Sequence, residues 1–245
     1  MLIDFRSLRA DYQRFRKGKE SRHSVSDRIN PTLFQYDYLV LKTLKRDIDS
    51  LITSLPDSEE QRVALDIGSD KSPYREFLSK KKFKVSTLDV DDGQGAEYVG
   101  TAEDTRLSDN SFDLVLCTQV LEHCQDPFRG IDEIQRILKP GGFAIISVPH
   151  IWFYHPHPSD YWRFTQEGVL QLCAKGQLVP RVLYAQGGTL LALFQVLNFL
   201  VYGVMASWGA PLYFLFNIAG LVFDKAVNNS LFCLNFTCLV QKAED

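Results

Sequence analysis

An apolar segment that runs directly into a tight turn and a helix start constrains this chain more than any other feature. Residues 63–67 are strand-like, Gly68 permits the turn, and residues 69–74 begin a helix. Such units are typical of doubly wound α/β sheets, which bind ligands outside the carboxyl ends of their strands. The next strand-like segment ends at Asp89, a little over twenty residues after Asp66, where a carboxylate can reach a ribose diol. We therefore expect a nucleoside-type ligand.

The other segments alternate between strand-like and helix-like periodicity, which predicts a parallel sheet. The expected strands are 62–67, 83–89, 97–99, 112–118 and 142–148, with a last, antiparallel one within 231–242. Helices are expected over 32–53, where apolar residues recur at helical spacing, and from Asp126-Pro127 to Pro140-Gly141.

Further motifs follow the turn in order along the chain. They are Asn110-Ser-Phe-Asp113, Leu121-Glu-His123, Asp126-Pro127 and Leu138-Lys-Pro-Gly-Gly142. As a set they resemble the class I S-adenosylmethionine-dependent methyltransferases, over about residues 62–175. The resemblance implies an enzyme with S-adenosylmethionine as cofactor. It also implies a doubly wound, Rossmann-like α/β fold with a mostly parallel seven-stranded sheet and an antiparallel last strand.

The resemblance gives roles to residues at the strand ends. Asp66 would face the cofactor's ammonium group, Gly68 would let its amino acid end approach closely, and Asp89 would bind the ribose hydroxyls. The full expected cofactor set is Asp66, Gly68, Asp70, Asp89, Val90, Ala102, Glu103, Thr118 and Gln119. Val90 would lie on the adenine face, Ala102 and Glu103 at its edge, and Thr118 and Gln119 beside the methionine part.

Two positions depart from the family pattern. Asp70 stands where the turn usually has a second glycine, and Thr101 where many members place an aspartate for the adenine amine. Aspartate tolerates left-handed dihedrals, and its charge suits a cationic ligand. The same departures leave open a non-catalytic scaffold protein that only binds S-adenosylmethionine.

A segment rich in aromatic and titratable side chains follows the fifth expected strand. Residues 149–165 read Pro-His-Ile-Trp-Phe-Tyr-His-Pro-His-Pro-Ser-Asp-Tyr-Trp-Arg-Phe-Thr and leave the sheet beside the expected methyl group. A similar pattern occurs in bacterial methyltransferases that sit among cell-surface glycan functions, which ranks glycan or lipid-linked small acceptors first. We expect Tyr154, Tyr161 and Arg163 to contact the acceptor.

Methyl transfer to oxygen needs an aligned acceptor and a base for the hydroxyl proton. His155 and His157 are the candidate bases because imidazole titrates near neutral pH, and Asp160 would orient one of them. Arg163 either holds an anionic part of the acceptor or pairs with Asp160 to lock the loop. His123 is expected to border the site rather than act as the base.

Composition and motifs limit the classes of partner and the cellular compartment that we expect. The net charge of −3 over 245 residues gives no basic footprint for nucleic acid. Residues 117–120 also lack the Asn- or Asp-Pro-Pro-aromatic motif of enzymes that methylate base amines. The five cysteines form no Cys-x-x-Cys pair and the start of the chain has no cleavable signal pattern, which favours a cytoplasmic setting. We expect no metal.

A long uncharged segment near the C-terminus is the third informative feature. None of the 42 residues between Arg181 and Asp224 is Asp, Glu, Lys, Arg or His, and residues 209–211 would split the run into two apolar helices. Each is near the lower limit of roughly 18–20 residues for a membrane span. The polar residues Gln195, Asn198 and Asn217 interrupt their faces. We expect a hairpin that either lies in a membrane interface, peripheral on the inner membrane face, or forms a homodimer contact.

Four regions are expected along the chain. They are a basic N-terminal arm with an amphipathic helix (1–57), a methyltransferase core (58–186), an apolar hairpin insertion (187–229) and the last strand of the core (230–245). Residues 1–30 hold eight Lys or Arg against four acids, so the arm is either a solvated terminus or an anchor for anionic surfaces.

Overall fold

The structure is a computed structural model that describes residues 10, 12–13, 25–68, 71–91, 95–156, 159–227 and 229–244. Two predicted site residues, Asp70 in the turn and His157 in the loop, lie outside the described residues, as does most of the basic arm. Their predicted roles stay predictions.

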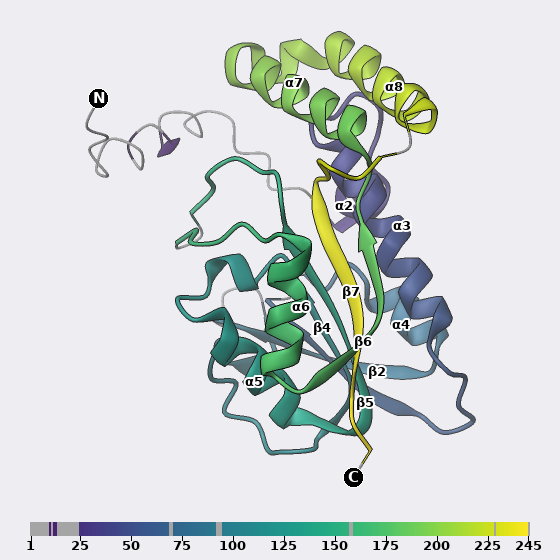
Figure 1. Ribbon diagram of the computed structural model, residues 1–245, viewed down its shortest axis with the longest axis vertical. Helices are drawn as coiled ribbons and strands as arrows, with labels where there is room; N and C mark the ends of the chain where they lie inside the picture. The colour runs from purple at the N-terminus through teal and green to yellow at the C-terminus, as the bar shows by residue number, and fades with distance from the viewer. Residues whose placement is uncertain are drawn as a thin grey trace.

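The described residues form one seven-stranded sheet in the order β3-β2-β1-β4-β5-β7-β6 (Figure 1). The strands are β1 (Arg62–Ile67), β2 (Phe83–Asp89), β3 (Tyr98–Val99), β4 (Phe112–Thr118), β5 (Leu138–Pro149), β6 (Leu178–Ala185) and β7 (Asn235–Lys242). β1 to β5 pair in parallel, whereas β7 runs antiparallel to both β5 and β6. The predicted Rossmann-like α/β fold is confirmed.

Helices cover both faces of the sheet. On one face α3 (Tyr38–Ser54) and α4 (Arg75–Lys80) bury residues such as Ile48 and Leu78 against β1 and β4, and α2 (Val25–Ile29) packs beside α3. On the other face α5 (Pro127–Ile137) and α6 (Gln166–Lys175) contribute Ile131 and Leu172 to the larger core. Both cores are apolar, and they fix the strand ends that carry the site.

Three elements differ from the sequence prediction. β5 begins at Leu138 rather than near 142, because Pro140 and Gly141 sit where the pairing register with β4 shifts instead of ending a helix. α3 begins at Tyr38, several residues later than predicted. β6 was not predicted, since Pro180 lies inside it; an edge strand accommodates this proline at a register shift against β7.

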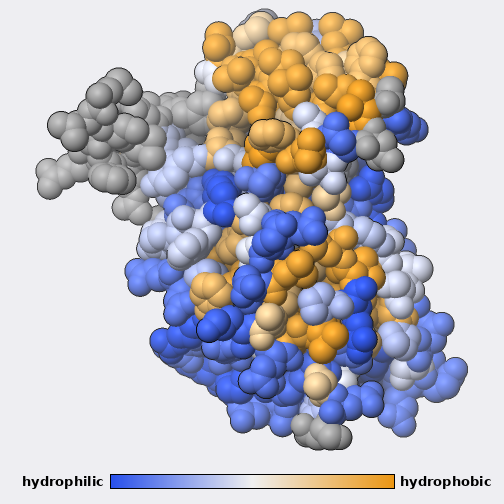
Figure 2. Space-filling view, viewed as in Figure 1, coloured by the Kyte–Doolittle hydropathy of each residue, from blue (hydrophilic) through white to orange (hydrophobic). Residues whose placement is uncertain are grey.

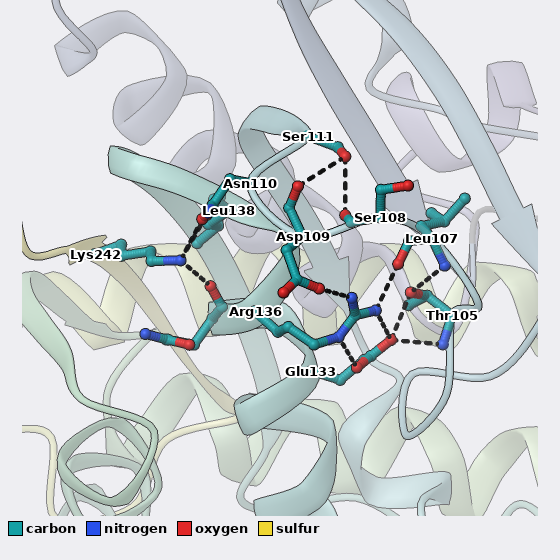
Figure 3. Close-up of polar contacts among 11 residues, drawn as sticks. Thr105, Leu107, Ser108, Asp109, Asn110, Ser111, Glu133, Arg136, Leu138 and Lys242 are labelled. Carbon is teal, nitrogen blue, oxygen red and sulfur yellow. Dashed lines mark hydrogen bonds and ion pairs between the residues drawn. The ribbon is translucent and has the colours of Figure 1, made fainter.

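A polar network fastens α5 to the segment that leads into β4 (Figure 3). Glu133 and Arg136 form an ion pair within the helix, and Arg136 also pairs with Asp109 and donates to the carbonyl of Leu107 at 2.7 Å. Thr105 donates from both its N–H and its hydroxyl to Glu133. Burial alone would raise the pKa of Glu133, but the hydrogen bonds from Arg136 and Thr105 outweigh it and lower that pKa to about 2.

The apolar run forms α7 (Thr189–Met205), a short 3-10 helix η2 (Ala206–Gly209) and α8 (Ala210–Ala226), inserted between β6 and β7. We call these residues, 189–226, the cap. The cap lies beyond the carboxyl end of β5 (Figure 1) and packs on the start of α3. Asp224 at the end of α8 accepts from the N–H groups of Gly188 and Leu191 and so caps α7.

The three polar residues that the sequence marked as interruptions of the apolar helices are buried and point away from the outer face of the cap. This corrects the sequence interpretation. Gln195, Asn198 and Asn217 are each at most 1% exposed. Gln195 accepts from Val40 N at 3.4 Å and donates to Tyr36 O at 2.8 Å, while Asn217 donates to the carbonyls of Leu33 and Gln35. These contacts join the cap to residues 33–40, and α3 begins where Gln195 meets it.

Candidate active site

Two acidic side chains stand at the carboxyl ends of neighbouring parallel strands, as predicted. Asp66 near the end of β1 is 2% exposed and accepts from the Ser72 hydroxyl at 2.7 Å. Asp89 ends β2, and its Oδ1 accepts from the N–H of Val90 at 2.8 Å. Burial raises the pKa of Asp66 to about 7, and the charge of Asp89 adds to this rise. The two carboxylates therefore interact across the strand ends.

Gly68 makes the turn after β1 in a left-handed conformation, with φ at +63°. A Cβ atom there would lie 2.5 Å from Cγ2 of Val120, so no larger residue fits without movement of its neighbour. The structure thus gives a second reason for this glycine besides ligand approach: the segment after β4 packs directly on it.

The other predicted cofactor residues line the same edge of the sheet. Val90 is 58% exposed, Ala102 is buried, and Glu103 accepts from Asp126 N at 2.8 Å. Thr118 ends β4. Gln119 follows with φ at +57°, held by hydrogen bonds from its backbone N–H and its side chain to Ser147. Their contacts with a cofactor stay predictions.

A buried acid that the sequence interpretation had not assigned a role lies next to these residues. Glu122, in the 3-10 helix η1 (Leu121–His123), is fully buried, and within the described part of the chain neither carboxylate oxygen has a hydrogen-bond partner. Burial raises the pKa of Glu122 to about 8. Burial also raises the pKa of the Cys117 thiol, and both Glu122 and Asp66 add to it, so the two acids flank the end of β4.

The described part of the predicted acceptor loop, residues 149–165, is fixed to η1. The backbone N–H groups of Tyr161 and Trp162 donate to the carbonyl of Glu122, at 2.8 and 3.3 Å. The indole N–H of Trp162 donates to Cys124 O at 2.9 Å. The loop therefore lies at the end of β4, where the sequence placed it. Within the loop, Tyr154 meets Tyr12 of the arm edge to face, at 6.1 Å between ring centroids.

An ion-paired aspartate organises this loop. Asp160 is 1% exposed in its side chain and accepts from both terminal nitrogens of Arg163, at 2.6 and 2.7 Å. It also accepts from the backbone N–H of His155 at 2.8 Å, and its Oδ2 lies 3.2 Å from His155 Nδ1. Burial alone would raise the pKa of Asp160, but the hydrogen bonds from Arg163 and His155 hold that pKa well below its usual range.

Arg163 uses its remaining donors inside the loop as well. Its Nε donates to Trp152 O, and its terminal nitrogens donate to Phe153 O and Trp162 O. Of the two roles that the sequence left open, the structure contains the loop-locking salt bridge. A contact of Arg163 with an acceptor stays a prediction.

The two site histidines lie together beside Glu122. The rings of His123 and His155 are 5.0 Å apart between centroids, and His123 Nε2 is 3.9 Å from a Glu122 carboxylate oxygen. One ligand atom from each of the three residues falls within 4.8 Å of the others, so the group has the spacing to hold a divalent ion, although the sequence predicted no metal.

The sheet order, the antiparallel β7 and the acids at the strand ends together define a Rossmann-like protein with Asp66 and Asp89 at the carboxyl ends of neighbouring strands. Comparison with known proteins specifies the class. Residues 65–146 match the profile of a family described as "Methyltransferase domain". This stretch, about a third of the chain, is thus similar to a methyltransferase domain, which agrees with the resemblance to class I S-adenosylmethionine-dependent methyltransferases seen in the sequence.

Relatives match over part of their length. The chain is 36% identical to human thiol S-methyltransferase TMT1B over 104 residues, which cover 42% of this chain and 39% of that protein. It is 36% identical over 74 residues to the ubiquinone biosynthesis O-methyltransferase of Thiobacillus denitrificans, covering 29% and 32% of the two chains. The chain thus spans well under half the length of both relatives.

Solved structures share the fold at low identity. The [4+2]-cyclase SpnF aligns with a TM-score of 0.56 at 15% identity, over 97% of this chain and 93% of that one. Phosphoethanolamine N-methyltransferase 2 of Haemonchus contortus aligns with a TM-score of 0.56 at 14% identity, over 91% and 60%. These likenesses support the fold.

The residues at the strand ends fit S-adenosylmethionine. The cofactor carries a sulfonium and an ammonium group against one carboxylate, and Asp66 and Glu122 are buried acids whose pKa values are raised by burial. A cation placed beside either acid would favour its ionised form and lower its pKa. Glu122 could have been suspected from the Leu-Glu-His motif, but its burial depends on the loop packed over it.

Proposed function

We propose that this chain is an S-adenosylmethionine-dependent methyltransferase that methylates a hydroxyl oxygen on a glycan, lipid-linked or other small-molecule acceptor. The pair formed by His155 and Asp160, which lies beside Glu122, supports this proposal most strongly. His155 Nδ1 lies 3.1 Å from Phe153 O and 3.2 Å from Asp160 Oδ2. When Nδ1 carries the proton and donates to these oxygens, Nε2 keeps the acceptor lone pair that a base for a hydroxyl proton needs.

The names of the relatives agree with an oxygen or sulfur acceptor. One is called a thiol S-methyltransferase and another an O-methyltransferase of ubiquinone biosynthesis. Both hydroxyl and thiol acceptors lose a proton on methylation, so a base at His155 serves either. We favour oxygen because the loop pattern resembles that of methyltransferases with cell-surface glycan functions.

The proposed mechanism assigns one task to each residue. S-adenosylmethionine supplies a methyl group activated on a sulfonium. Asp66 and Asp89 would hold the cofactor's ammonium and ribose, and His155 would take the proton of the acceptor hydroxyl as the new C–O bond forms and the bond from the methyl carbon to the sulfonium breaks, leaving the demethylated thioether product. Asp160 fixes the imidazole tautomer and stabilises the imidazolium, and it stays ionised because Arg163 pairs with it.

Calorimetry combined with a turnover assay tests the proposal. Asp89→Ala should abolish binding of both S-adenosylmethionine and its demethylated product. His155→Ala should leave cofactor affinity nearly intact while turnover of a hydroxyl acceptor falls roughly 10²- to 10⁴-fold. A wild-type chain that gives no heat with either ligand would have a decayed cofactor site, and one that binds both ligands without turnover would be the scaffold. A large affinity loss in His155→Ala would move this residue into the cofactor site.

A further inference from the structure

The outer face of the cap is the largest feature that the proposed reaction does not use. Twelve of the residues 189–223, all of which the structure describes, are exposed, and Ser207 is the one polar side chain among them. Large apolar side chains that are 38–87% exposed make up most of this face: Leu193, Val196, Leu200, Val204, Met205, Trp208, Leu215, Ile218, Val222 and Phe223. Figure 2 shows them gathered over α7 and α8.

The hydrogen-bonding side chains of the cap point the other way. Gln195 and Asn217 bind the backbone of residues 33–40, and Asn198 donates to Asn217 at 2.7 Å inside the hairpin. The outer face therefore offers a partner apolar contact and almost no hydrogen bonds. The hydrocarbon interior of a bilayer makes only apolar contacts, whereas protein interfaces are typically only about 56–65% apolar, with a polar rim.

We propose that the outer face of the cap binds a lipid bilayer. The face gathers ten exposed large apolar side chains, whereas monomeric soluble proteins rarely expose contiguous apolar patches larger than a few hundred Å². A second copy of the chain would also cover it. However, the lack of polar groups up to its edge and its freedom from charge over 182–223 match the uncharged interior of a bilayer better than a protein surface.

The length of the helices sets how deeply the cap enters. By length and composition, the helical stretch Thr189–Lys225 would suffice to cross a membrane. It is folded into two helices of 17 residues, each about 25 Å long and shorter than the roughly 30 Å hydrocarbon core. Both ends return to the sheet, and Asp224 joins them at the base. The cap therefore lies in one leaflet, with Trp208, 85% exposed at the turn, as an interfacial anchor.

Charge around the cap complements an anionic membrane surface. Lys225 is exposed in the last turn of α8, directly where the apolar face ends. In the sequence, residues 1–30 carry a net charge of +4. Tyr12, one of the described residues of this segment, contacts Tyr154 of the acceptor loop. Anionic headgroups should therefore strengthen binding without being required for it.

The cap also contacts the acceptor loop. Phe153 stacks on Phe199 of α7 at 3.9 Å between ring centroids, and Trp152 packs against the cluster that contains Leu191. A cap seated in a bilayer would thus hold residues 152–153 at the membrane surface. This step rests on the proposed function and specifies it: the acceptor is lipid-linked, with its hydroxyl presented at the headgroup level.

Vesicle flotation of the full chain without cofactor tests the bilayer surface separately from catalysis. We expect binding to phosphatidylcholine vesicles and tighter binding when phosphatidylglycerol is included. Val204→Glu and Trp208→Glu should each weaken partition about 10-fold, and the double variant about 100-fold, because a charge on the lipid face is costly to bury. Leu170→Glu, on an exposed apolar residue of α6, is the matched control and should have no effect.

Three outcomes would overturn the proposal. One is vesicle binding that the double variant leaves unchanged, since the arm alone would then bind lipid. Another is a wild-type chain that ignores both vesicles, and the third is a dimer in sedimentation velocity that the double variant dissociates and that does not bind lipid. Calorimetry of the double variant with S-adenosylmethionine in solution should match the wild type, so a lost cofactor site and a lost membrane surface are told apart.

Discussion

The strand ends with η1 and the acceptor loop both contain carboxylates with inaccessible side chains, but the pKa values of these carboxylates shift in opposite directions. At the strand ends and in η1, burial raises the pKa of Asp66 to about 7 and that of Glu122 to about 8. In the loop, the Asp160 side chain is 1% exposed although the residue is only partly buried, and hydrogen bonds from Arg163 and His155 hold its pKa below the usual range. Asp160 is thus already ion-paired with Arg163. Asp66 and Glu122 have no comparable ion pair among the described residues, so a cationic ligand could pair with them.

The largest effect should come from a variant that removes the cation paired with Asp160, so that the loop also contains a buried carboxylate without an ion pair. Arg163→Ala leaves Asp160 buried without its cation and removes the donors to three loop carbonyls. We expect a loss of about 3–5 kcal/mol in the free energy of unfolding. Urea denaturation followed by circular dichroism measures it. Arg181→Ala, which removes one exposed hydrogen bond to Gln241, should cost well under 1 kcal/mol. Equal effects of the two variants would refute the buried ion pair.

The reverse change removes the unsatisfied acid from η1. Folded Glu122 holds its proton up to about pH 8, whereas the unfolded chain ionises near 4.5. The stability that comes from this group is thus complete below about pH 4.5 and lost as pH rises through 8. Glu122→Gln should therefore stabilise the protein by about 2–4 kcal/mol at pH 9 and hardly at pH 4.5.

A second glutamate supplies the control of opposite sign. Glu133 is paired with Arg136 (Figure 3), and the hydrogen bonds from Arg136 and Thr105 outweigh burial and lower its pKa to about 2. Its contribution is present above about pH 4.5 and lost in acid, so Glu133→Gln should destabilise the protein at neutral pH. Denaturant titrations of both variants at two pH values would contradict this view if the variants shifted in the same direction.

The end of β1 also depends on the turn that follows it. Gly68→Ala must adopt a left-handed backbone and meets Val120 at 2.5 Å, so we expect a loss of about 1–3 kcal/mol. Gly95→Ala is a matched control, because φ there is +76° but a Cβ would meet none of the described residues within 4 Å. Thermal unfolding of the two variants should show a larger loss for Gly68→Ala, which adds a contact with Val120 to the backbone strain, than for Gly95→Ala, which has the strain alone. Equal losses would mean that Val120 moves freely.

The smallest expected effect is a pH dependence of the affinity for S-adenosylmethionine. A cofactor cation favours ionised Asp66, and the pKa of this group in the free protein is about 7 because of burial, with Asp89 raising it and Arg75 and Arg28 lowering it. Affinity for S-adenosylmethionine should thus fall by up to tenfold per pH unit below about 7. Calorimetry between pH 5 and 7.5 measures this slope, and Asp66→Asn should flatten it. A flat wild-type profile would mean that Asp66 does not meet the cation.

Local patterns were enough for much of the fold. β1, β2 and β4 have the predicted bounds, and Asp126 caps α5 as its Asp-Pro sequence indicates. The failures came where tertiary contacts override local preference. Pro180 disfavours a strand until β7 pairs with it, and α3 begins where Gln195, over 150 residues away, accepts from Val40.

By itself the sequence determined the Rossmann-like sheet, the acidic strand ends and the position of the acceptor loop, because each is encoded in a short stretch of periodicity and turn residues. Only the tertiary structure decided which charges are satisfied and which way the cap faces. Asp160 and Glu122 are both acids in polar motifs, and their different pKa values arise from what packs over them. Gln195, Asn198 and Asn217 look like interruptions in an apolar run until residues 33–40 dock against them. Burial and pairing are properties of contacts between distant segments, so no local pattern contains them.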